Sequence, residues 1–286
     1  MKRIISVLIC LAFVCSGAAS GYAGESPHET GGSEEIREPV RLPIVMYHQM
    51  TKSPDKVGQF TILAEQFDED LEYLISAGYE SITVQQLLDW YDGADSLPAK
   101  PMMVTFDDGY ETTLEYAQPI LKKHGCTAVV AVVGAIADWY TEIDDHNLNY
   151  SHLSWKDVQK MSESPEYEIQ CHTFDMHKLE ARCGCDKIAS ESTESYTAAL
   201  REDITKYELK CAENGVNSLK TVAYPYGYFC KDTIDVFQGM GYRLGFTCVE
   251  KVNVIDGSPE DMLVLGRYNR EPGKSSQEFF SRWDEN

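Results

Sequence analysis

The stretch that decides the fold runs Met102-Met103-Val104-Thr105-Phe106-Asp107-Asp108-Gly109-Tyr110. In it, an apolar strand leads straight into two adjacent carboxylates. Because neighbouring residues on a strand point to opposite faces, Asp107 and Asp108 reach one site only if the strand breaks there, and Gly109 permits that break. One carboxylate can then hold a metal while the other moves a proton. Taken alone, the pattern is equally compatible with a plain Asp-Gly turn.

Short β-rich runs alternate with helical patterns on both sides of this stretch. We predict strands over residues 42–47, 81–84, 101–106, 127–133, 168–171, 221–224, 244–248 and 262–266. We predict helices over residues 64–77, 111–124 and 193–213, and others that begin at Thr83, at Ser154 with a capping box to Asp157, and after Ser276. This alternation predicts an α/β fold with a mainly parallel sheet. Seven or eight such units predict a distorted (β/α) barrel, with an open doubly wound sheet as the alternative, and a barrel places catalytic residues where strands end.

A second candidate site follows the predicted strand at 168–171. The chain there reads Cys171-His172-Thr173-Phe174-Asp175-Met176-His177. A single histidine is more often structural, but His172 and His177 can converge on one ion if the chain turns between them. Together with one aspartate they make a set of two histidines and one carboxylate, which leaves coordination positions open.

A third candidate loop follows the strand at 221–224 and reads Ala223-Tyr224-Pro225-Tyr226-Gly227-Tyr228. Pro225, Tyr226 and Gly227 predict a rigid turn with an aromatic face. Such a turn can present a backbone N–H to a developing oxyanion and a ring to a sugar. A turn that merely packs tyrosines has the same composition.

His48 ends the first predicted strand, in Met46-Tyr47-His48. A histidine at a strand end is a candidate for the active site, and a capping or core histidine fits the position equally well.

The N-terminal residues have the pattern of an export signal. Lys2 and Arg3 precede a short apolar run at residues 4–14, and small residues suited to cleavage follow. We predict a secretory signal peptide over residues 1–23, with an uncleaved anchor as the alternative, and a flexible polar linker over residues 24–40. No later segment is long and apolar enough to span a bilayer. We therefore expect an exported protein, extracellular or associated with the cell envelope, with one domain over residues 41–286.

The chain is strongly acidic, with a net charge of −21. Loss of Lys2 and Arg3 with the signal would make it −23. Such a surface repels nucleic acid and anionic membranes, and it is compatible with a neutral or cationic glycan.

Seven of the nine cysteines lie after the predicted signal. An exported protein can form disulfides, and an odd number leaves at least one thiol unpaired. Cys183-Gly184-Cys185 has no second cysteine pair at zinc-ribbon spacing, which favours a disulfide or unpaired thiols over a structural zinc.

The three motifs in this order resemble the polysaccharide deacetylase (NodB-homology) family, carbohydrate esterase family 4. The resemblance covers about residues 41 to 285, and the combination of Thr-Phe-Asp-Asp-Gly, the histidine pair and Pro-Tyr-Gly is highly specific. It implies a distorted (β/α) barrel whose catalytic domain holds a divalent metal, most often zinc, with cobalt, nickel or iron as alternatives.

The resemblance also implies roles for individual residues. Asp107 is the expected general base, and Asp108, His172 and His177 are the expected metal ligands. Tyr226 lies where the family supplies the backbone N–H of an oxyanion hole.

Two positions depart from the usual family pattern. Many members have arginine two residues before the proline of the third motif, where this chain has Ala223. Many also end with Leu-x-His, whose histidine is the catalytic acid, whereas the last predicted strand here continues as Leu265-Gly266-Arg267-Tyr268-Asn269-Arg270. With Met46-Tyr47-His48, these features look like the branch of poly-β-1,6-N-acetylglucosamine deacetylases. His48 is then the candidate acid, and return of the proton from Asp107 is the alternative.

The implied activity is removal of N-acetyl groups from an N-acetylglucosamine-containing polysaccharide of the exopolysaccharide, peptidoglycan or chitin type. The same machinery serves O-acetyl esterases that act on xylan. A non-catalytic glycan-binding protein on the same scaffold is a third possibility, although binding alone gives no reason to keep Asp107, Asp108 and both histidines.

Overall fold

The computed structural model describes residues 38–284, except the side chains of residues 259 and 260. The predicted signal peptide and residues 24–37 of the predicted linker lie outside the described residues. The strands are β1 (Val40–Leu42), β2 (Ile44–Tyr47), β3 (Gln49–Thr51), β4 (Thr61–Leu63), β5 (Glu80–Ser81), β6 (Pro101–Phe106), β7 (Ala128–Val132), β8 (Tyr167–Cys171), β9 (Ser218–Ala223), β10 (Leu244–Phe246), β11 (Asn253–Ile255) and β12 (Tyr268–Asn269). The α-helices are α1 (Ala64–Ser76), α2 (Val84–Tyr91), α3 (Gln118–His124), α4 (Gly134–Ile143), α5 (Trp155–Ser162), α6 (Thr193–Glu213), α7 (Lys231–Gly239), α8 (Pro259–Met262) and α9 (Ser276–Phe280). Shorter helical segments are η1 (Pro54–Lys56), the π-helical η2 (Thr113–Ala117), η3 (Pro225–Gly227) and η4 (Ser281–Trp283).

The main sheet has eight strands in the order β10-β9-β8-β7-β6-β2-β12, with β5 paired to β6. Every pairing in it is parallel. Leu265 forms a parallel bridge with Phe246 of β10, and the same stretch then continues into β12 at the other edge. The sheet therefore curls until one segment touches both edges, which confirms the predicted distorted (β/α) barrel.

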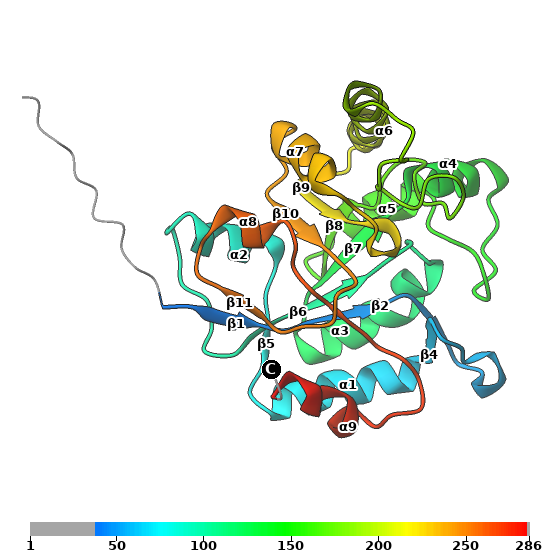
Figure 1. Ribbon diagram of the computed structural model, residues 1–286. Coiled ribbons are helices and arrows are strands. Elements are labelled where there is room, and N and C mark those ends of the chain that lie inside the picture. Colours follow the sequence, from blue (N-terminus) through cyan, green and yellow to red (C-terminus); the bar gives the residue numbers. More distant parts are fainter. Residues whose placement is uncertain (1–37, 285–286) are drawn as a thin grey trace, which may run out of the picture. The chain divides into compact units, whose positions relative to one another are not determined.

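Successive side chains of each strand point alternately into the barrel interior and toward the helices that surround it. Met102, Val104 and Phe106 of β6 pack in the large cluster that the helices cover. Met103 belongs to a second cluster, to which β7, β9 and β10 also contribute alternate residues. Helices α1, α3 and α9 lie outside β2 and β6 (Figure 1). Asp107 is an even number of residues after Met103, so its side chain points to the same face. The first acid of the motif therefore lies on the inner face of the barrel, at the end of β6.

Several predicted elements have the expected limits. β6 spans the predicted 101–106 and α6 the predicted 193–213. The helix predicted over 111–124 is present, with η2 as a π-helical segment inside it. Ser154 and Thr83 both close capping boxes, with Asp157 and Gln86 respectively. None of the helices in the described part of the chain is long and apolar enough to cross a membrane.

Three predicted strands differ in the structure. The strand predicted over 42–47 is divided at Pro43, and its first part, β1, pairs antiparallel with β11 in a separate two-stranded sheet. The predicted 81–84 strand is only β5, because Val84 already begins α2. The strand predicted over 262–266 is wrong, since Met262 ends α8 and regular pairing begins at β12.

The last error has a local cause. The side-chain amide of Asn253 bonds both main-chain groups of Gly266, donating to its oxygen at 2.9 Å and accepting from its N–H at 2.7 Å. A side chain thus takes hydrogen bonds that a neighbouring strand would otherwise take. The alternation of β and α elements also gave no prediction of the strands β3, β4 and β11 or of the helices α4, α7 and α8.

Candidate metal and catalytic site

Three loops meet at the C-terminal ends of β6, β8 and β9, and each contains a non-glycine residue with a left-handed backbone. These residues are Asp108 with φ 70°, Thr173 with φ 67° and Tyr226 with φ 57°. Such conformations cost of order 1–3 kcal/mol each and persist where the surroundings hold them. The break after β6 begins at Asp108 itself and continues through Gly109 with φ 68°. The turn brings the second acid to the end of the barrel.

Asp108, His172 and His177 converge on one point. His177 Nε2 lies 3.1 Å and His172 Nε2 3.4 Å from the same oxygen of Asp108. One ligand atom from each residue lies within 4.8 Å of the other two. A tetrahedral ion with ligand distances of about 2.1 Å holds its ligand atoms roughly 3.4 Å apart. The spacing of these three side chains therefore fits a first-row divalent ion.

The outer nitrogens of both histidines are engaged. His172 Nδ1 lies 2.7 Å from the carbonyl oxygen of Ala223, so this nitrogen carries the proton. His177 Nδ1 lies 3.2 Å from the hydroxyl of Tyr226, whose ring packs on the imidazole with centroids 4.4 Å apart. The donor bond at Nδ1 of His172 directs its Nε2 toward Asp108, which is the arrangement that metal-binding histidines adopt. His177 Nε2 faces the same Asp108 oxygen.

The turn between the histidines is held by α6. Asp203 accepts hydrogen bonds from the N–H groups of Phe174 and Asp175 at 2.7 and 2.8 Å. Burial raises the pKa of Asp203. These two bonds hold the turn between His172 and His177, without which the two histidines could not converge.

Electrostatics favour the ionised form of Asp108. Burial raises its pKa, but hydrogen bonds from His172 and His177 outweigh that effect, and the net pKa lies well below the usual range. Asp108 is therefore present as a carboxylate, the form that binds a metal.

Asp107 lies buried and is held by an arginine from the last strand region. Arg267 donates from both terminal nitrogens to the two carboxylate oxygens, at 2.7 Å each. It also donates to the Thr105 hydroxyl at 3.2 Å and the Thr247 carbonyl at 3.0 Å. Burial raises the pKa of Asp107, yet Arg267 and then His172 offset this, so that the pKa is lowered overall. The result is an oriented carboxylate that stays ionised.

Tyr47, the last residue of β2, pairs with Phe106, the last residue of the neighbouring β6. The residues that follow them, His48 and Asp107, therefore lie level with each other. Its ring packs against Phe60 with centroids 4.8 Å apart. Burial lowers the pKa of His48, and the carboxylates of Asp107 and Asp108 act in the opposite direction. The predicted position at the catalytic end of the barrel is thus observed.

The turn at Pro225, Tyr226 and Gly227 forms η3 at the end of β9. Gly227 donates its N–H to Tyr224 at 2.8 Å, and Tyr228 donates to Pro225 at 3.1 Å. The Tyr226 N–H, in contrast, has no acceptor among the described residues. A free main-chain donor therefore lies beside His177.

Two groups at the site had no role assigned from the sequence. The signal in the sequence is that Arg267 directly follows an apolar stretch. The structure buries Arg267 fully, and a buried charge needs a charged partner. His152 stacks on Tyr110 with centroids 4.2 Å apart, and burial lowers the pKa of His152 to about 4. The polar loop that carries His152 gave no sign of this, because only an isolated bridge between Tyr110 and His152 brings it to the end of β6.

A parallel barrel whose loops bring two histidines and two aspartates to the C-terminal end of its strands has the arrangement in which barrel enzymes place their active sites. Residues 94–245 match the family described as polysaccharide deacetylase. The chain belongs to the polysaccharide deacetylase family.

Individual relatives agree with this assignment. A poly-beta-1,6-N-acetyl-D-glucosamine N-deacetylase from Staphylococcus aureus (strain MRSA252) is 30% identical over 199 residues, which are 70% of this chain and 65% of the relative. The structure of IcaB from Ammonifex degensii superposes with a TM-score of 0.66 at 25% identity, covering 82% of this chain and 94% of that one. A de-N-acetylase from Aggregatibacter actinomycetemcomitans shares the fold, with a TM-score of 0.69 at 24% identity over 86% and 99% of the two chains. The match thus spans about two thirds of the Staphylococcus protein and nearly all of the two solved chains.

Proposed function

We propose that this protein is a metal-dependent hydrolase that removes N-acetyl groups from an N-acetylglucosamine-containing polysaccharide. The observation that carries the proposal is the convergence of Asp108, His172 and His177, with both Nε2 atoms facing the same Asp108 oxygen, next to an oriented and ionised Asp107. The names of the Staphylococcus relative and of the Aggregatibacter structure support an N-linked acetyl group and a polymer of N-acetylglucosamine.

Asp108, His172 and His177 would hold the divalent ion. Two imidazoles and one carboxylate with open positions suit zinc best, and cobalt, nickel or iron accept the same donors. When bound, such an ion acts as a Lewis acid toward a carbonyl oxygen and makes water a better nucleophile.

The protein's own groups then divide the proton transfers. Asp107 accepts the proton of the attacking water, and the paired bonds from Arg267 hold its carboxylate in place during the transfer. The Tyr226 N–H donates to the oxygen on which negative charge develops. His48 donates a proton to the departing sugar amine.

The substrate partner is an N-acetylated glycan, and we propose that the protein meets it outside the cell or at the cell envelope. The signal-like pattern at residues 1–23 supports that location. The acidic chain is suited to a product that gains positive charge with each acetyl group lost.

Acetate release tests the proposal. Zinc-loaded protein is incubated with N-acetylated β-1,6-glucosamine oligomers, chitooligosaccharides and acetylxylan, and we expect release from the N-acetylated substrates. Release from acetylxylan alone would indicate an O-acetyl esterase, and glycan binding without acetate would indicate a binding protein.

His172→Ala tests the ligand assignment. We expect it to lose bound metal and activity together, because it removes one of three ligands. The matched control is His124→Ala, since His124 also pairs with an aspartate, Asp68 at 2.6 Å, but lies at the end of α3. Full metal content in His172→Ala would exclude the proposed ligand set.

A further inference from the structure

We propose that residues 178–192, which follow the ligand His177, form a brace that positions the turn at residues 225–228, with Gly184 as its positioning residue. The inference rests on the proposed function, because it concerns the placement of the Tyr226 N–H. It adds a structural requirement outside the groups that touch substrate.

Gly184 packs directly against the turn. Its φ is 52°, and a Cβ at this position would lie 2.4 Å from the carbonyl oxygen of Pro225 and 3.2 Å from the Cβ of Tyr228. Its neighbour Cys185 donates its N–H to the carbonyl of Tyr228 at 3.1 Å. Main chain therefore lies directly on main chain, which only glycine allows here.

The brace is anchored at the same point to two helices. The carbonyl oxygen of Cys185 accepts hydrogen bonds from the Tyr196 hydroxyl of α6 at 2.6 Å and from the Thr233 hydroxyl of α7 at 3.0 Å. The Thr233 hydroxyl also lies 3.4 Å from the Cys230 sulfur. Cys185, Tyr196 and Thr233 are all fully buried. The contact on the turn is thus set by the barrel helices.

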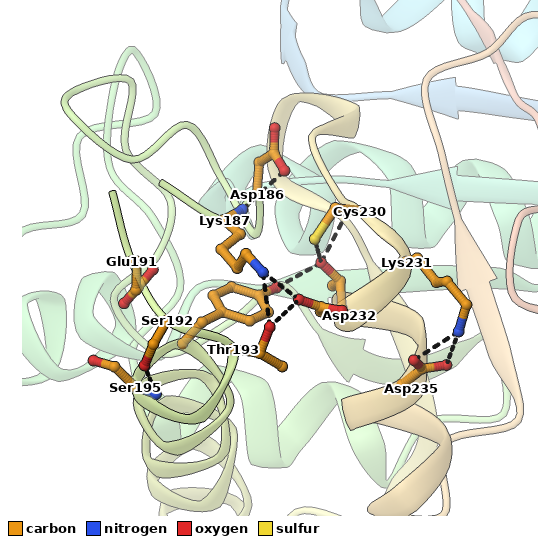
Figure 2. Close-up of polar contacts among 12 residues, drawn as sticks. Asp186, Lys187, Glu191, Ser192, Thr193, Ser195, Cys230, Lys231, Asp232 and Asp235 are labelled. Carbon is orange, nitrogen blue, oxygen red and sulfur yellow. Dashed lines mark hydrogen bonds and ion pairs between the residues drawn. The ribbon is translucent and has the colours of Figure 1, made fainter. Parts of the chain in front are cut away.

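A second tie holds the outer part of the brace. Lys187 lies 2.6 Å from the Asp232 carboxylate of α7 and 2.9 Å from the Thr193 hydroxyl at the start of α6. Thr193 in turn donates to Asp232 at 3.1 Å, so the three side chains close a triangle (Figure 2). Within the brace, Arg182 makes two bonds to Glu191, at 2.8 and 2.7 Å.

The turn needs such support because of its own conformation. Tyr226 is a half-exposed non-glycine residue at φ 57°, so its local preference is for another conformation. An oxyanion donor must lie within about 2.7–3.1 Å of the charge that develops, and a displacement of about 1 Å can cost about 10²-fold in rate. A shift of the Pro225 carbonyl would move the N–H that follows it.

Gly184→Ala, compared with Gly241→Ala, tests the brace. Both glycines have positive φ, but Gly241 has φ 82° and no atom within 4 Å of an added Cβ. The two variants thus carry similar backbone strain, and only the first pushes on the turn. We expect kcat of Gly184→Ala to fall about 10- to 10²-fold, with KM and metal content little changed and with a larger loss in Tm than in Gly241→Ala, because only its Cβ meets main chain. Equal kcat values in the two folded variants would overturn the proposal, as would loss of metal from Gly184→Ala.

A second pair decides the matter if Gly184→Ala does not fold. Lys187→Met removes the tie to Asp232, whereas Lys231→Met removes the same charge from a pair with Asp235 inside α7, at 2.8 Å (Figure 2). We expect a several-fold lower kcat for Lys187→Met alone. Equal kcat in both variants would reject the brace. Failure of the proposed function appears differently, as absence of acetate release from the unmodified protein.

Discussion

Two buried arginine–aspartate pairs lie within one short stretch of the chain and do different work. Arg267 makes two bonds to Asp107, and Arg270 makes two bonds to Asp70, at 2.8 and 3.1 Å. Both arginines are inaccessible to solvent. The first pair belongs to the catalytic end of the barrel, and the second lies beneath helix α1.

The difference lies in how many donors each carboxylate receives. Asp70 also accepts hydrogen bonds from the hydroxyls of Tyr47 at 3.0 Å and Ser276 at 2.7 Å, and from Gln66 at 3.2 Å. Asp107 has Arg267 as its side-chain donor within the described residues. A carboxylate has about four acceptor positions. Asp70 is saturated and structural, whereas Asp107 keeps positions available for a proton.

One strand serves both pairs by alternation. Tyr47 at the end of β2 points to Asp70, and the next residue, His48, falls beside Asp107. The two sites can therefore be separated by substitutions at adjacent positions.

The largest expected effect separates the two carboxylates. Asp107→Asn should keep its metal and lose about 10²–10⁴-fold in kcat, as expected for a lost general base. Asp70→Asn should lower the free energy of unfolding by roughly 3–5 kcal/mol, because it leaves Arg270 buried without its partner, and kcat per folded molecule should stay near normal. Denaturant unfolding and acetate release measure the two effects. Near-normal turnover of Asp107→Asn would remove it from the mechanism.

The next effect separates the adjacent residues of β2. His48→Gln should lower kcat by about 10²-fold if His48 is the general acid, with metal and substrate binding retained. Because burial lowers the pKa of His48, the alkaline limb of kcat/KM should begin below the ordinary histidine value of about 6.5. His48→Gln should remove that limb.

Tyr47→Phe is the control for His48→Gln. It should cost roughly 1 kcal/mol of stability for the lost hydrogen bond to Asp70 and leave the pH profile unchanged. If His48→Gln keeps the unmodified rate and profile, the acid role passes to Asp107.

A smaller effect separates the two arginines. Lysine cannot make the paired bonds of a guanidinium. Arg267→Lys should lower kcat by about 10-fold, within the range typical of groups that orient a catalytic residue, whereas Arg270→Lys should lower Tm and leave kcat unchanged. A kinetic defect in Arg270→Lys at full folding would contradict the division.

The smallest effect is on acid stability. The pKa of Asp107 is lowered in the folded protein, so its contribution to stability is present above the ordinary aspartate pKa of about 3.9 and is lost as pH falls through the lower folded value. In metal-free protein, unfolding free energies of the unmodified chain and Asp107→Asn should therefore converge below about pH 4. A constant difference down to pH 2 would show that ionisation of Asp107 does not contribute.

The sequence pattern predicted the limits of those helices and strands whose two ends are marked by a capping residue, a turn residue or a charge. β6 ends where the apolar run meets Asp107. Helix α6 begins after its N-cap Ser192 and ends at Glu213, before its C-cap Asn214. The pattern failed at residues 262–266, where Met262 ends α8, Leu265 keeps one bridge to Phe246, and the side chain of Asn253 bonds Gly266. Composition carries no record of such a contact.

The sequence by itself determined which residues could hold a metal, because strand ends in a parallel barrel meet at one edge and Asp108, His172 and His177 each follow a strand. Only the tertiary structure decided what supports them. Ala223 lacks the arginine expected in its motif, and Arg267, 160 positions away from Asp107, faces that acid from another strand region. Arg270, three residues later, serves the core instead. The packing of distant strands and helices alone determines which acid each arginine meets.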